Sequence, residues 1–282
     1  MDYVIIGAGL TGLHIAQSLH SQNKNYVILE KSKGLGGRVA TRRIDDLGLD
    51  HGANYLDEAI NNMPFPLKSS EHGHYVTGGM NQIAKFMAQN LNIQKEQKLS
   101  VIKKSQAGWM LETEEGLKLE TKHIIITAPV PQALELLEKN DLAPSKDHEL
   151  YSIHYTKALI FLAILNSCDE MKSMSFENHS FHLMKERNLH PKGLVIQCSA
   201  DFSEQYFDRP EATTVAAILD FMKRSPFGPL QIEKHELKKW RYSRPLKTYS
   251  QNFIELHPHL FLCADGFGLP LESAQALINR LL

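Results

Sequence analysis

Short apolar runs alternate with polar segments from the N-terminus onward, and they set the expected fold. Residues 3–6 are apolar and are followed at once by Gly7, which is typical of a buried parallel strand. Residues 10–21 place Leu13 and Ala16 at helical spacing, and residues 26–29 form a second apolar run. A strand, a helix and a strand in this order predict a βαβ unit at the start of the chain.

Later segments add more elements to this pattern. Strands are expected at 98–103, 109–114, 117–119, 123–127, 157–165, 193–200 and 259–263. Glu115 and Gly116 indicate a hairpin turn between two of them. Helices are expected at 211–223 and 271–282. Because the last strand and helix return to the pattern of the first residues, we expect both ends of the chain to share one domain.

The glycines after the first strand have the spacing of a phosphate-binding turn. Gly7, Gly9 and Gly12 form a GxGxxG pattern. The first glycine permits a tight turn, the second lets the backbone approach a pyrophosphate, and the third lets helix and strand pack closely. Free N–H groups at the helix start favour phosphate charge. Glu30 ends the next strand, where a carboxylate accepts hydrogen bonds from ribose, so the pattern predicts a dinucleotide site.

A second glycine pair indicates which dinucleotide is bound. Gly36 and Gly37 would let the backbone crowd a phosphate, and Arg38 would supply a bidentate cation to it. Arg42 would add a second charge. A nicotinamide dinucleotide does not need this second clamp, so the pattern favours FAD. A solvated basic loop is the alternative interpretation.

Composition narrows the class of protein. The chain has 282 residues, enough for two domains, with 43% hydrophobic and 22% charged residues and a formal net charge of -1. That charge gives no electrostatic footprint for nucleic acid or an anionic membrane. Three scattered cysteines without a CxxC pattern argue against a disulfide framework, and we identify no signal peptide or membrane-spanning run. We therefore expect a cytoplasmic protein.

Together the motifs resemble the flavin-containing amine oxidase superfamily. The resemblance rests first on GAGLTG, ILEKSKGLGGRVATRR and DHGANY, at 7–12, 28–43 and 50–55. Later segments are most similar to the renalase-type branch: VTGGMNQIAKFMAQNL at 76–91, HIIITAPVPQALELL at 123–137, WRYSRP at 240–245 and CADGFGLPLESA at 263–274. The closing motif departs from the usual pattern, with Ala264 in place of glycine and Ser273 in place of glycine.

The resemblance implies a set of FAD contacts. Asp265 would accept a hydrogen bond from the ribityl chain, and a helix that begins near Glu272 would point its N-terminus at the flavin. Leu99 would contact the adenine through its backbone. The full set comprises Gly7, Gly9, Leu10, Thr11, Gly12, Glu30, Lys31, Gly36, Gly37, Arg38, Gly52, Ala53, Met80, Leu99, Ala128, Asp265, Glu272 and Ala274.

The expected fold class is α/β, with a Rossmann-like FAD-binding domain and an inserted mixed-sheet substrate domain. The FAD-binding domain would be discontinuous, over 1–60, 75–150 and 256–282. The substrate domain would take 61–74 and 151–255.

The resemblance also implies the reaction. A renalase-type protein would oxidise an isomeric dihydronicotinamide dinucleotide by hydride transfer to the flavin, with oxygen as the acceptor. A small amine is the second choice of substrate, and a hydrophobic polyene is the third. A flavin-binding redox module without turnover is the rival class. Trp240, Arg241 and Tyr242 are the substrate candidates, because an indole stacks on a nucleotide and a guanidinium pairs with phosphate; core packing is the alternative.

No catalytic acid or base is assigned from the sequence. His51 lies beside a motif glycine and would be either a packed loop histidine, an acid/base group or a covalent attachment point. Cys263 ends an apolar strand and is expected in the core, so we expect non-covalent FAD. His72 and His74 lack further ligands at metal spacing, so no metal site is expected.

Overall fold

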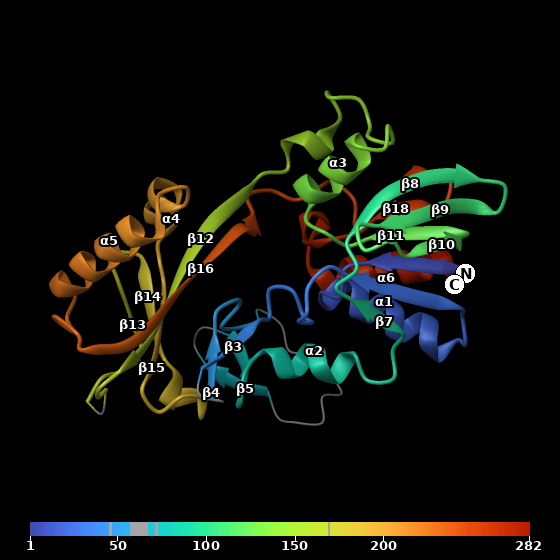
Figure 1. The fold of residues 1–282 in the computed structure, drawn as a ribbon. Helices are drawn as coiled ribbons and strands as arrows, with labels where there is room; N and C mark the ends of the chain where they lie inside the picture. The colour runs from blue at the N-terminus through green and yellow to red at the C-terminus, as the bar shows by residue number, and fades with distance from the viewer. Residues whose placement is uncertain (45–46, 57–66, 71–72, 169) are drawn as a thin grey trace. The chain divides into compact units, whose positions relative to one another are not determined.

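The computed structural model describes residues 1–44, 47–56, 67–70, 73–168 and 170–282, and these divide into two compact units (Figure 1). Unit 1 comprises Met1–Gly37, Ala84–His154 and Pro245–Leu282, and unit 2 comprises Arg38–Ile83 and Tyr155–Arg244. Both units are discontinuous, because the chain passes from one to the other at four points.

These borders differ from the expected domain borders. Unit 2 takes residues 38–56 and 75–83, which the sequence analysis assigned to the FAD-binding domain. The reason lies in hairpins that the sequence analysis did not predict. They pair within themselves, and the apolar side chain of Leu49 packs against the sheet of unit 2. The expected borders at 60 and 61 lie outside the described residues.

Unit 1 is built on a six-stranded sheet with the order β17-β18-β11-β1-β2-β7. The strands are β1 (Tyr3–Ile6), β2 (Tyr26–Glu30), β7 (Ile93–Lys95), β11 (His123–Ile126), β17 (Ile254–His257) and β18 (Leu260–Leu262). All neighbours pair in parallel except β17, which is antiparallel to β18. With α1 (Leu10–Ser21) between them, β1 and β2 confirm the predicted βαβ unit. The strand order places β1 at the centre, where its apolar side chains are buried.

Helices and a smaller sheet complete unit 1. Helix α1 packs against α6 (Pro270–Leu281), so the two ends of the chain meet in one unit, as the sequence predicts (Figure 1). A three-stranded antiparallel sheet contains β8 (Leu99–Ser105), β9 (Gly108–Thr113) and β10 (Lys118–Thr121), and the expected turn at Gly116 joins the last two. The remaining elements are α3 (Val130–Glu138) and the 3-10 helices η1 (Glu149–Ser152) and η3 (Asp265–Phe267). Helix α2 (Asn81–Met87) spans the border between the units.

Unit 2 is built on a five-stranded sheet with the order β13-β14-β15-β12-β16. The strands are β12 (Tyr155–Leu165), β13 (Met174–Phe176), β14 (His179–Leu183), β15 (Gly193–Gln197) and β16 (Ile232–Pro245). The first four strands of that order pair antiparallel to one another. The 3-10 helix η2 (Met184–Arg187) follows β14.

The two faces of this sheet pack against different elements, because side chains alternate along each strand. On β12, Leu159 and Phe161 lie in a core that includes Phe221 of α5 (Glu211–Arg224), and α4 (Ala200–Tyr206) covers the same face. Ile160 and Leu162 lie on the other face and pack with Leu49. That residue belongs to a hairpin of β3 (Thr41–Ile44) and β4 (Leu47–Asp50), and a second hairpin joins β5 (Leu67–Ser70) to β6 (Gly73–Val76).

Candidate functional site

The carboxyl ends of the parallel strands in unit 1 gather most of the predicted cofactor residues. Gly7 follows β1, Glu30 ends β2, Ala128 follows β11 and Asp265 follows β18. Strand order reverses at β1, since the chain builds β2 and β7 on one side and then β11 and β18 on the other. Open α/β sheets bind ligands outside the carboxyl ends at such a reversal. This edge is therefore the candidate dinucleotide site.

The three motif glycines lie in different local environments. Gly7 has a φ of 107°, in the left-handed region that favours glycine. A Cβ on Gly12 would lie 2.1 Å from the carbonyl oxygen of Gly7, so only glycine fits there. A Cβ on Gly9 would meet no atom of the described residues within 4 Å, its chain neighbours aside. The fold therefore leaves open space at Gly9, into which a ligand could approach the backbone.

The second glycine pair lies directly against the first motif. The N–H of Gly36 donates to the carbonyl of Ala8 at 2.8 Å, and Gly9 and Gly36 form a parallel bridge. Gly36 and Gly37 both have left-handed backbones, with φ of 97° and 54°. A Cβ on Gly37 would lie 3.6 Å from the Cα of Gly9. The backbones of the two glycine segments thus meet at the N-terminus of α1.

Glu30 is buried and holds this region together through its carboxylate. One oxygen accepts the N–H of Ala8 at 2.8 Å, and the other accepts the N–H of Ser32 at 2.7 Å. Each carboxylate oxygen accepts more than one hydrogen bond, so ribose hydroxyls remain within its capacity. The neighbouring Lys31 instead directs its Nζ to Gln132 Oε1, 3.5 Å away.

Two helix N-termini in unit 1 are suited to negative charge. Helix α1 begins after Gly9 and α6 after Leu269, and neither has a side-chain cap within the described part of the chain. The predicted Leu10 and Thr11 form the first turn of α1. Free N–H groups and the helix dipole attract phosphate or a reduced flavin.

The closing motif surrounds the start of α6. Asp265 is buried in η3, Ala274 is buried in the helix, and Glu272 is exposed in its first turn. The hydroxyl of Ser273 is fully buried without a hydrogen-bond partner among the described residues. These donors and acceptors fit the polar part of a dinucleotide such as FAD. Leu99 is buried at the start of β8, beside a register shift in the pairing with β9.

Arg38, Gly52 and Ala53 form a tight backbone contact in unit 2. The N–H of Ala53 donates to the carbonyl of Arg38 at 2.7 Å, and a Cβ on Gly52 would lie 1.8 Å from that oxygen. The Arg38 guanidinium donates through Nη1 to the carbonyl of Ser243 at 3.0 Å. The predicted glycine-alanine motif therefore fixes the backbone that carries Arg38.

A buried carboxylate that the sequence analysis did not single out anchors Met80. Asp50 has no exposed surface, and its Oδ1 accepts the hydroxyl of Thr41 at 2.5 Å and the N–H of Met80 at 3.0 Å. The N–H of Asn81 donates in turn to the hydroxyl of Thr41 at 3.2 Å. The available signal was an acidic residue at the end of an apolar strand, two residues before the glycine of DHGANY.

The three substrate candidates do not lie together. Trp240 donates its indole N–H to the carbonyl of His51 at 2.7 Å and stacks on that imidazole, with ring centroids 5.6 Å apart. Arg241 points to the opposite face of β16, where it pairs with Asp208 at 3.2 Å. Its guanidinium also lies over the ring of Phe207. Successive residues of a strand point to opposite faces, so the expected joint role of Trp240 and Arg241 is corrected.

Tyr242 contacts the neighbouring strand β12 of the same sheet. Its ring packs edge-on against Tyr155, with centroids 5.8 Å apart. Aromatic pairs in this arrangement are stabilising.

A small charged cluster surrounds His51. Arg42, predicted as a second phosphate ligand, instead forms a bidentate pair with Glu236 at 2.9 to 3.1 Å, and Lys238 contacts the same carboxylate at 2.6 Å. Burial, and then the cations of Lys238 and Arg42, lower the pKa of His51 to about 4. Its Nδ1 is buried without a partner among the described residues. The imidazole is therefore neutral at pH 7.

The thiols are unsuited to nucleophilic attack. Cys263 and Cys198 are buried, and burial raises the pKa of each thiol to about 12. The thiolate is the reactive form, so neither residue is poised for a flavin linkage. In the described part of the chain no three His, Cys, Asp or Glu side chains group as metal ligands, and no helix is long and apolar enough to cross a membrane. His72 lies outside the described residues.

Comparison with known families agrees with this architecture. The model of an NAD(P)-binding Rossmann-like domain matches residues 5–64. The fold and this match define the class: an α/β protein with a Rossmann-like dinucleotide-binding domain. The model of flavin containing amine oxidoreductases matches residues 65–167. This second match supports the flavin-containing amine oxidase superfamily.

Individual relatives are distant. An FAD-dependent oxidoreductase of Cochliobolus heterostrophus, oblC, is 35% identical over 74 residues, which are 23% of this chain and 15% of that protein. The chain thus matches only a small part of this curated relative's length. Cyclohexylamine oxidase from Brevibacterium oxydans has a TM-score of 0.70 at 13% identity, with 99% of both chains covered. Putrescine oxidase bound to putrescine has a TM-score of 0.73 at 12% identity, with 99% of this chain and 98% of that one covered. At such identities the solved structures show a shared fold.

Proposed function

We propose that this protein is an FAD-dependent oxidoreductase that catalyses a two-electron oxidation. One observation carries the proposal: the backbones of Gly9 and Gly36 meet at the carboxyl edge of the parallel sheet, next to the buried carboxylate of Glu30. A single glycine motif is common to many nucleotide sites, whereas two paired glycine segments suit a pyrophosphate held from two sides. Bound FAD would supply the redox chemistry, and the protein would position the reactants.

The residues of unit 1 divide the work of holding FAD. The uncapped start of α1 and the backbones of Gly9 and Gly36 would hold the pyrophosphate, and Glu30 would accept hydrogen bonds from ribose. Asp265 would bind the ribityl chain. The start of α6 would stabilise negative charge on the reduced flavin. By resemblance, we assign further contacts in unit 1 to Lys31, Leu99, Ala128, Glu272 and Ala274.

For the substrate we propose an isomeric dihydronicotinamide dinucleotide, as in the renalase-type branch. Support comes from the His51 and Trp240 stack, which offers an aromatic surface for a nucleotide. Beside it, two cations, Arg42 and Lys238, share the single carboxylate of Glu236. This local excess of positive charge suits a pyrophosphate and repels a protonated amine. Arg241 has no part in this proposal, because it pairs with Asp208 on the other face.

Such a substrate asks little acid or base chemistry of the protein. A dihydropyridine already carries a labile hydride, so orientation toward the flavin is most of the task. The neutral imidazole of His51 agrees with a side chain that orients the substrate and transfers no proton. We further propose that oxygen reoxidises the flavin. The three free, buried cysteines favour a reducing compartment such as the cytoplasm.

The cofactor proposal is tested by two matched variants. Gly9→Ala adds a methyl group where the protein leaves space, and Gly34→Ala does the same at another open position of the glycine-rich segment. We expect both proteins to fold with unchanged melting temperatures when free of FAD. Only Gly9→Ala should lose FAD affinity, measured by fluorescence titration. Equal affinity in both would remove Gly9 from the site.

Acid precipitation tests the mode of attachment. We expect a yellow supernatant with the mass of FAD, because both buried thiols with a raised pKa are inert. Colour that stays in the pellet would show a covalent linkage and direct attention to His51.

The substrate proposal is tested by anaerobic reduction of the bound flavin. The 2- and 6-dihydronicotinamide isomers of the dinucleotide should bleach the flavin faster than any member of a panel of amines at equal concentration. Faster bleaching by an amine would favour an amine oxidase. A flavin that none of these compounds reduces would favour a redox module.

A further inference from the structure

Strand β16 lies at the edge of the unit 2 sheet and is long for an edge strand. It runs over 14 residues, Ile232–Pro245, and the strand order places β12 on one side of it and no described strand on the other. An exposed strand edge presents backbone N–H and C=O groups that another strand can pair with. In natural proteins, lysine residues on an edge strand often prevent pairing with another strand. The charges along β16 therefore determine which strand can pair with it.

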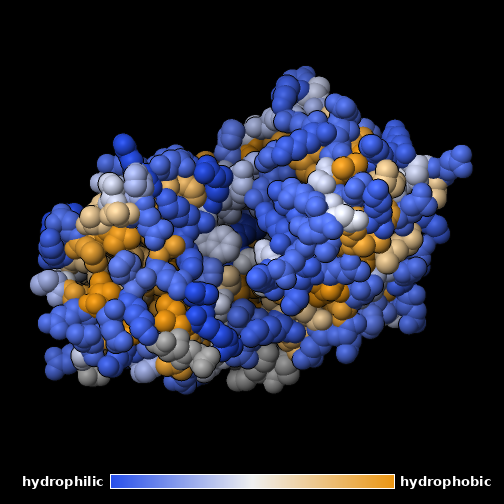
Figure 2. All heavy atoms as spheres, viewed as in Figure 1, coloured by the Kyte–Doolittle hydropathy of each residue, from blue (hydrophilic) through white to orange (hydrophobic). Residues whose placement is uncertain are grey.

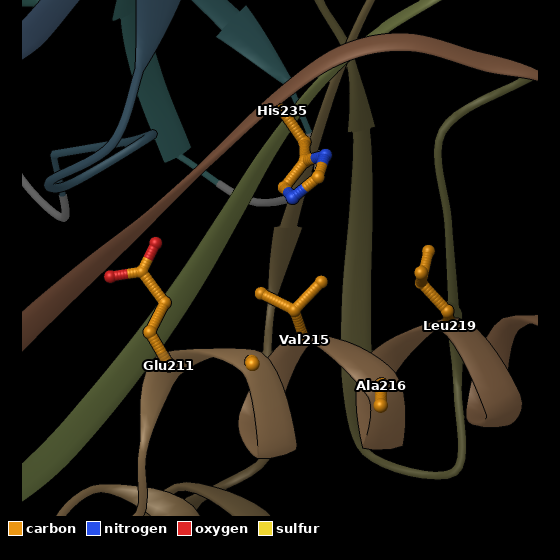
Figure 3. A pocket seen from close by; sticks show the side chains of 6 residues that line it. Glu211, Val215, Ala216, Leu219 and His235 are labelled. Atoms are coloured by element: carbon orange, nitrogen blue, oxygen red, sulfur yellow. The ribbon is translucent and has the colours of Figure 1, made fainter.

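A groove accompanies this edge on the helical side of the sheet. It lies between α5 and β16, has a volume of about 490 Å³, and is open to solvent (Figure 3). Figure 2 shows hydrophobic side chains on the surface in this region of unit 2. The groove is lined by Glu211, Ala212, Val215, Ala216, Leu219 and His235. Figure 3 shows His235 projecting from the strand toward the helix. An apolar groove beside a strand edge is completed when an added strand places side chains over it.

The side chains that would cover the groove are those on the helical face of β16. Leu237 belongs to the core that α5 helps to form, and His235 stacks on Phe161 of the same core. Arg241 pairs with Asp208 on this face. Odd-numbered residues of β16 therefore face the helices, and even-numbered residues face the opposite way.

The charge sequence of β16 is complementary to itself in one antiparallel register. When Leu237 lies opposite Leu237 of a second copy, Glu236 faces Lys238 of that copy and Glu233 faces Arg241 of that copy. Every such pair occurs twice by symmetry. Residues directly opposite each other in an antiparallel pair share a face and interact through their side chains.

Neighbouring registers lack this match. A shift that centres the pair on Lys238 places the two Lys238 ammonium groups face to face. A shift that centres it on Glu236 places the two Glu236 carboxylates face to face and pairs Lys234 with Lys238. Like charges directly opposite each other destabilise a strand pair. The charges thus select the Leu237-centred register against these alternatives.

We infer that β16 pairs with β16 of a second copy of this chain in the Leu237-centred antiparallel register. The contact is a twofold, self-complementary interface that joins two five-stranded sheets into one continuous sheet. In this register Lys239 of the second copy lies opposite His235, the β16 residue that lines the α5 groove. The inference does not rest on the FAD site.

Charge complementation between two variants tests both the dimer and its register. Glu233→Lys places lysine opposite Arg241 of a second copy, and Arg241→Glu places glutamate opposite Glu233. We expect each variant alone to dimerise at least roughly tenfold more weakly than the wild type, because two attractive pairs become repulsive. An equimolar mixture restores opposite charges at both pairs, so the mixture should dimerise as the wild type does. Both residues are exposed, so folding should persist.

Light scattering on a sizing column gives the readout. The wild type should have about twice the chain mass of 32.0 kDa, and each single variant should move toward the monomer mass. Lys139→Glu, an exposed charge reversal directly after α3, is the control and should remain dimeric. Thermal melts confirm that every variant is folded. A wild-type monomer, a dimer that both single variants retain, or a mixture of folded variants that stays monomeric would overturn the inference.

Discussion

The two units present their functional groups in different ways. Unit 1 offers mainly backbone: glycine turns, two uncapped helix starts and one buried carboxylate, all at the ends of parallel strands. Unit 2 offers side chains on the faces of an antiparallel sheet, such as Trp240 stacked on His51 and Arg42 paired with Glu236. A backbone site tolerates almost no change in residue size. A side-chain site depends instead on which way each strand residue points.

The largest expected effect is the destabilisation of unit 1 by one added methyl group. In Gly12→Ala the new Cβ would lie 2.1 Å from the carbonyl of Gly7, a contact that requires α1 to move away from β1. We expect destabilisation of more than about 4 kcal/mol, measured by urea unfolding, since the clash is with backbone and cannot relax through a side chain. Gly34→Ala, where the Cβ meets nothing, is the control. Similar stability of both variants would contradict the packing role of Gly12.

The next effect belongs to unit 2 and appears with pH. The pKa of His51 is lowered in the folded state to about 4, below its unfolded value of 6.5. The unfolded chain therefore binds more protons between these values, and stability falls as pH drops from about 6.5 to 4. A shift of this size corresponds to about 3 kcal/mol. Stability that is full at pH 7.5 should thus be partly lost at pH 4.5.

The comparison of wild type with His51→Gln isolates this contribution. Urea unfolding at both pH values should show a smaller difference for the variant by about 2 to 3 kcal/mol. Other acid-sensitive groups remain in both proteins and cancel. Equal pH dependence would mean that His51 is more exposed to water than its buried Nδ1 indicates.

A smaller effect returns to unit 1. Glu30→Gln keeps the shape of the side chain but leaves one carbonyl oxygen for the two N–H groups of Ala8 and Ser32. Loss of one charge-assisted hydrogen bond should cost about 1.5 to 3 kcal/mol of stability without cofactor. FAD affinity should fall further, because the ribose acceptor is weakened. Urea unfolding of the cofactor-free protein and FAD titration measure the two losses separately, and no change in either would contradict the role of Glu30.

The smallest effect separates the two neighbours on β16. Arg241→Ala removes an exposed ion pair with Asp208 and should change stability by less than about 1 kcal/mol. It should leave the KM for the dihydronicotinamide substrate unchanged, whereas Trp240→Ala should raise it. A raised KM in Arg241→Ala at a concentration where the protein stays in one oligomeric state would restore Arg241 to the substrate site.

The same contrast explains what the sequence predicts well. The βαβ unit and the closing strand and helix are confirmed, because their strands are uninterrupted apolar runs and the nearby glycines leave few alternatives. The hairpins β3–β4 and β5–β6 and strands β13 and β14 were not predicted. These strands are three to five residues long and mix polar with apolar residues, so no continuous apolar run marks them.

Parts of the site escaped prediction for a related reason. Asp50 contacts Thr41 across a hairpin that was not predicted and Met80 at a sequence separation of 30 residues, and no local pattern marks such contacts. The separation of Arg241 from Trp240 follows from strand alternation, but which face each would take depends on how α4 and α5 pack. The two glycine segments around Gly9 and Gly36 could be predicted, because glycine spacing is visible in the sequence of each segment.

The four passages of the chain between the units govern the order in which the protein is able to fold during synthesis. All of unit 2 has been made once residue 244 leaves the ribosome, whereas unit 1 still lacks residues 245–282 at that point. Those residues include β18, which extends the parallel sheet beyond β11, and the helix α6 that packs on α1. Strand β1 is thus at the centre of a sheet that receives β18 only after the whole of unit 2 has been synthesised. A nascent chain stalled just after residue 244 has left the ribosome should therefore hold a folded unit 2 and a protease-sensitive unit 1.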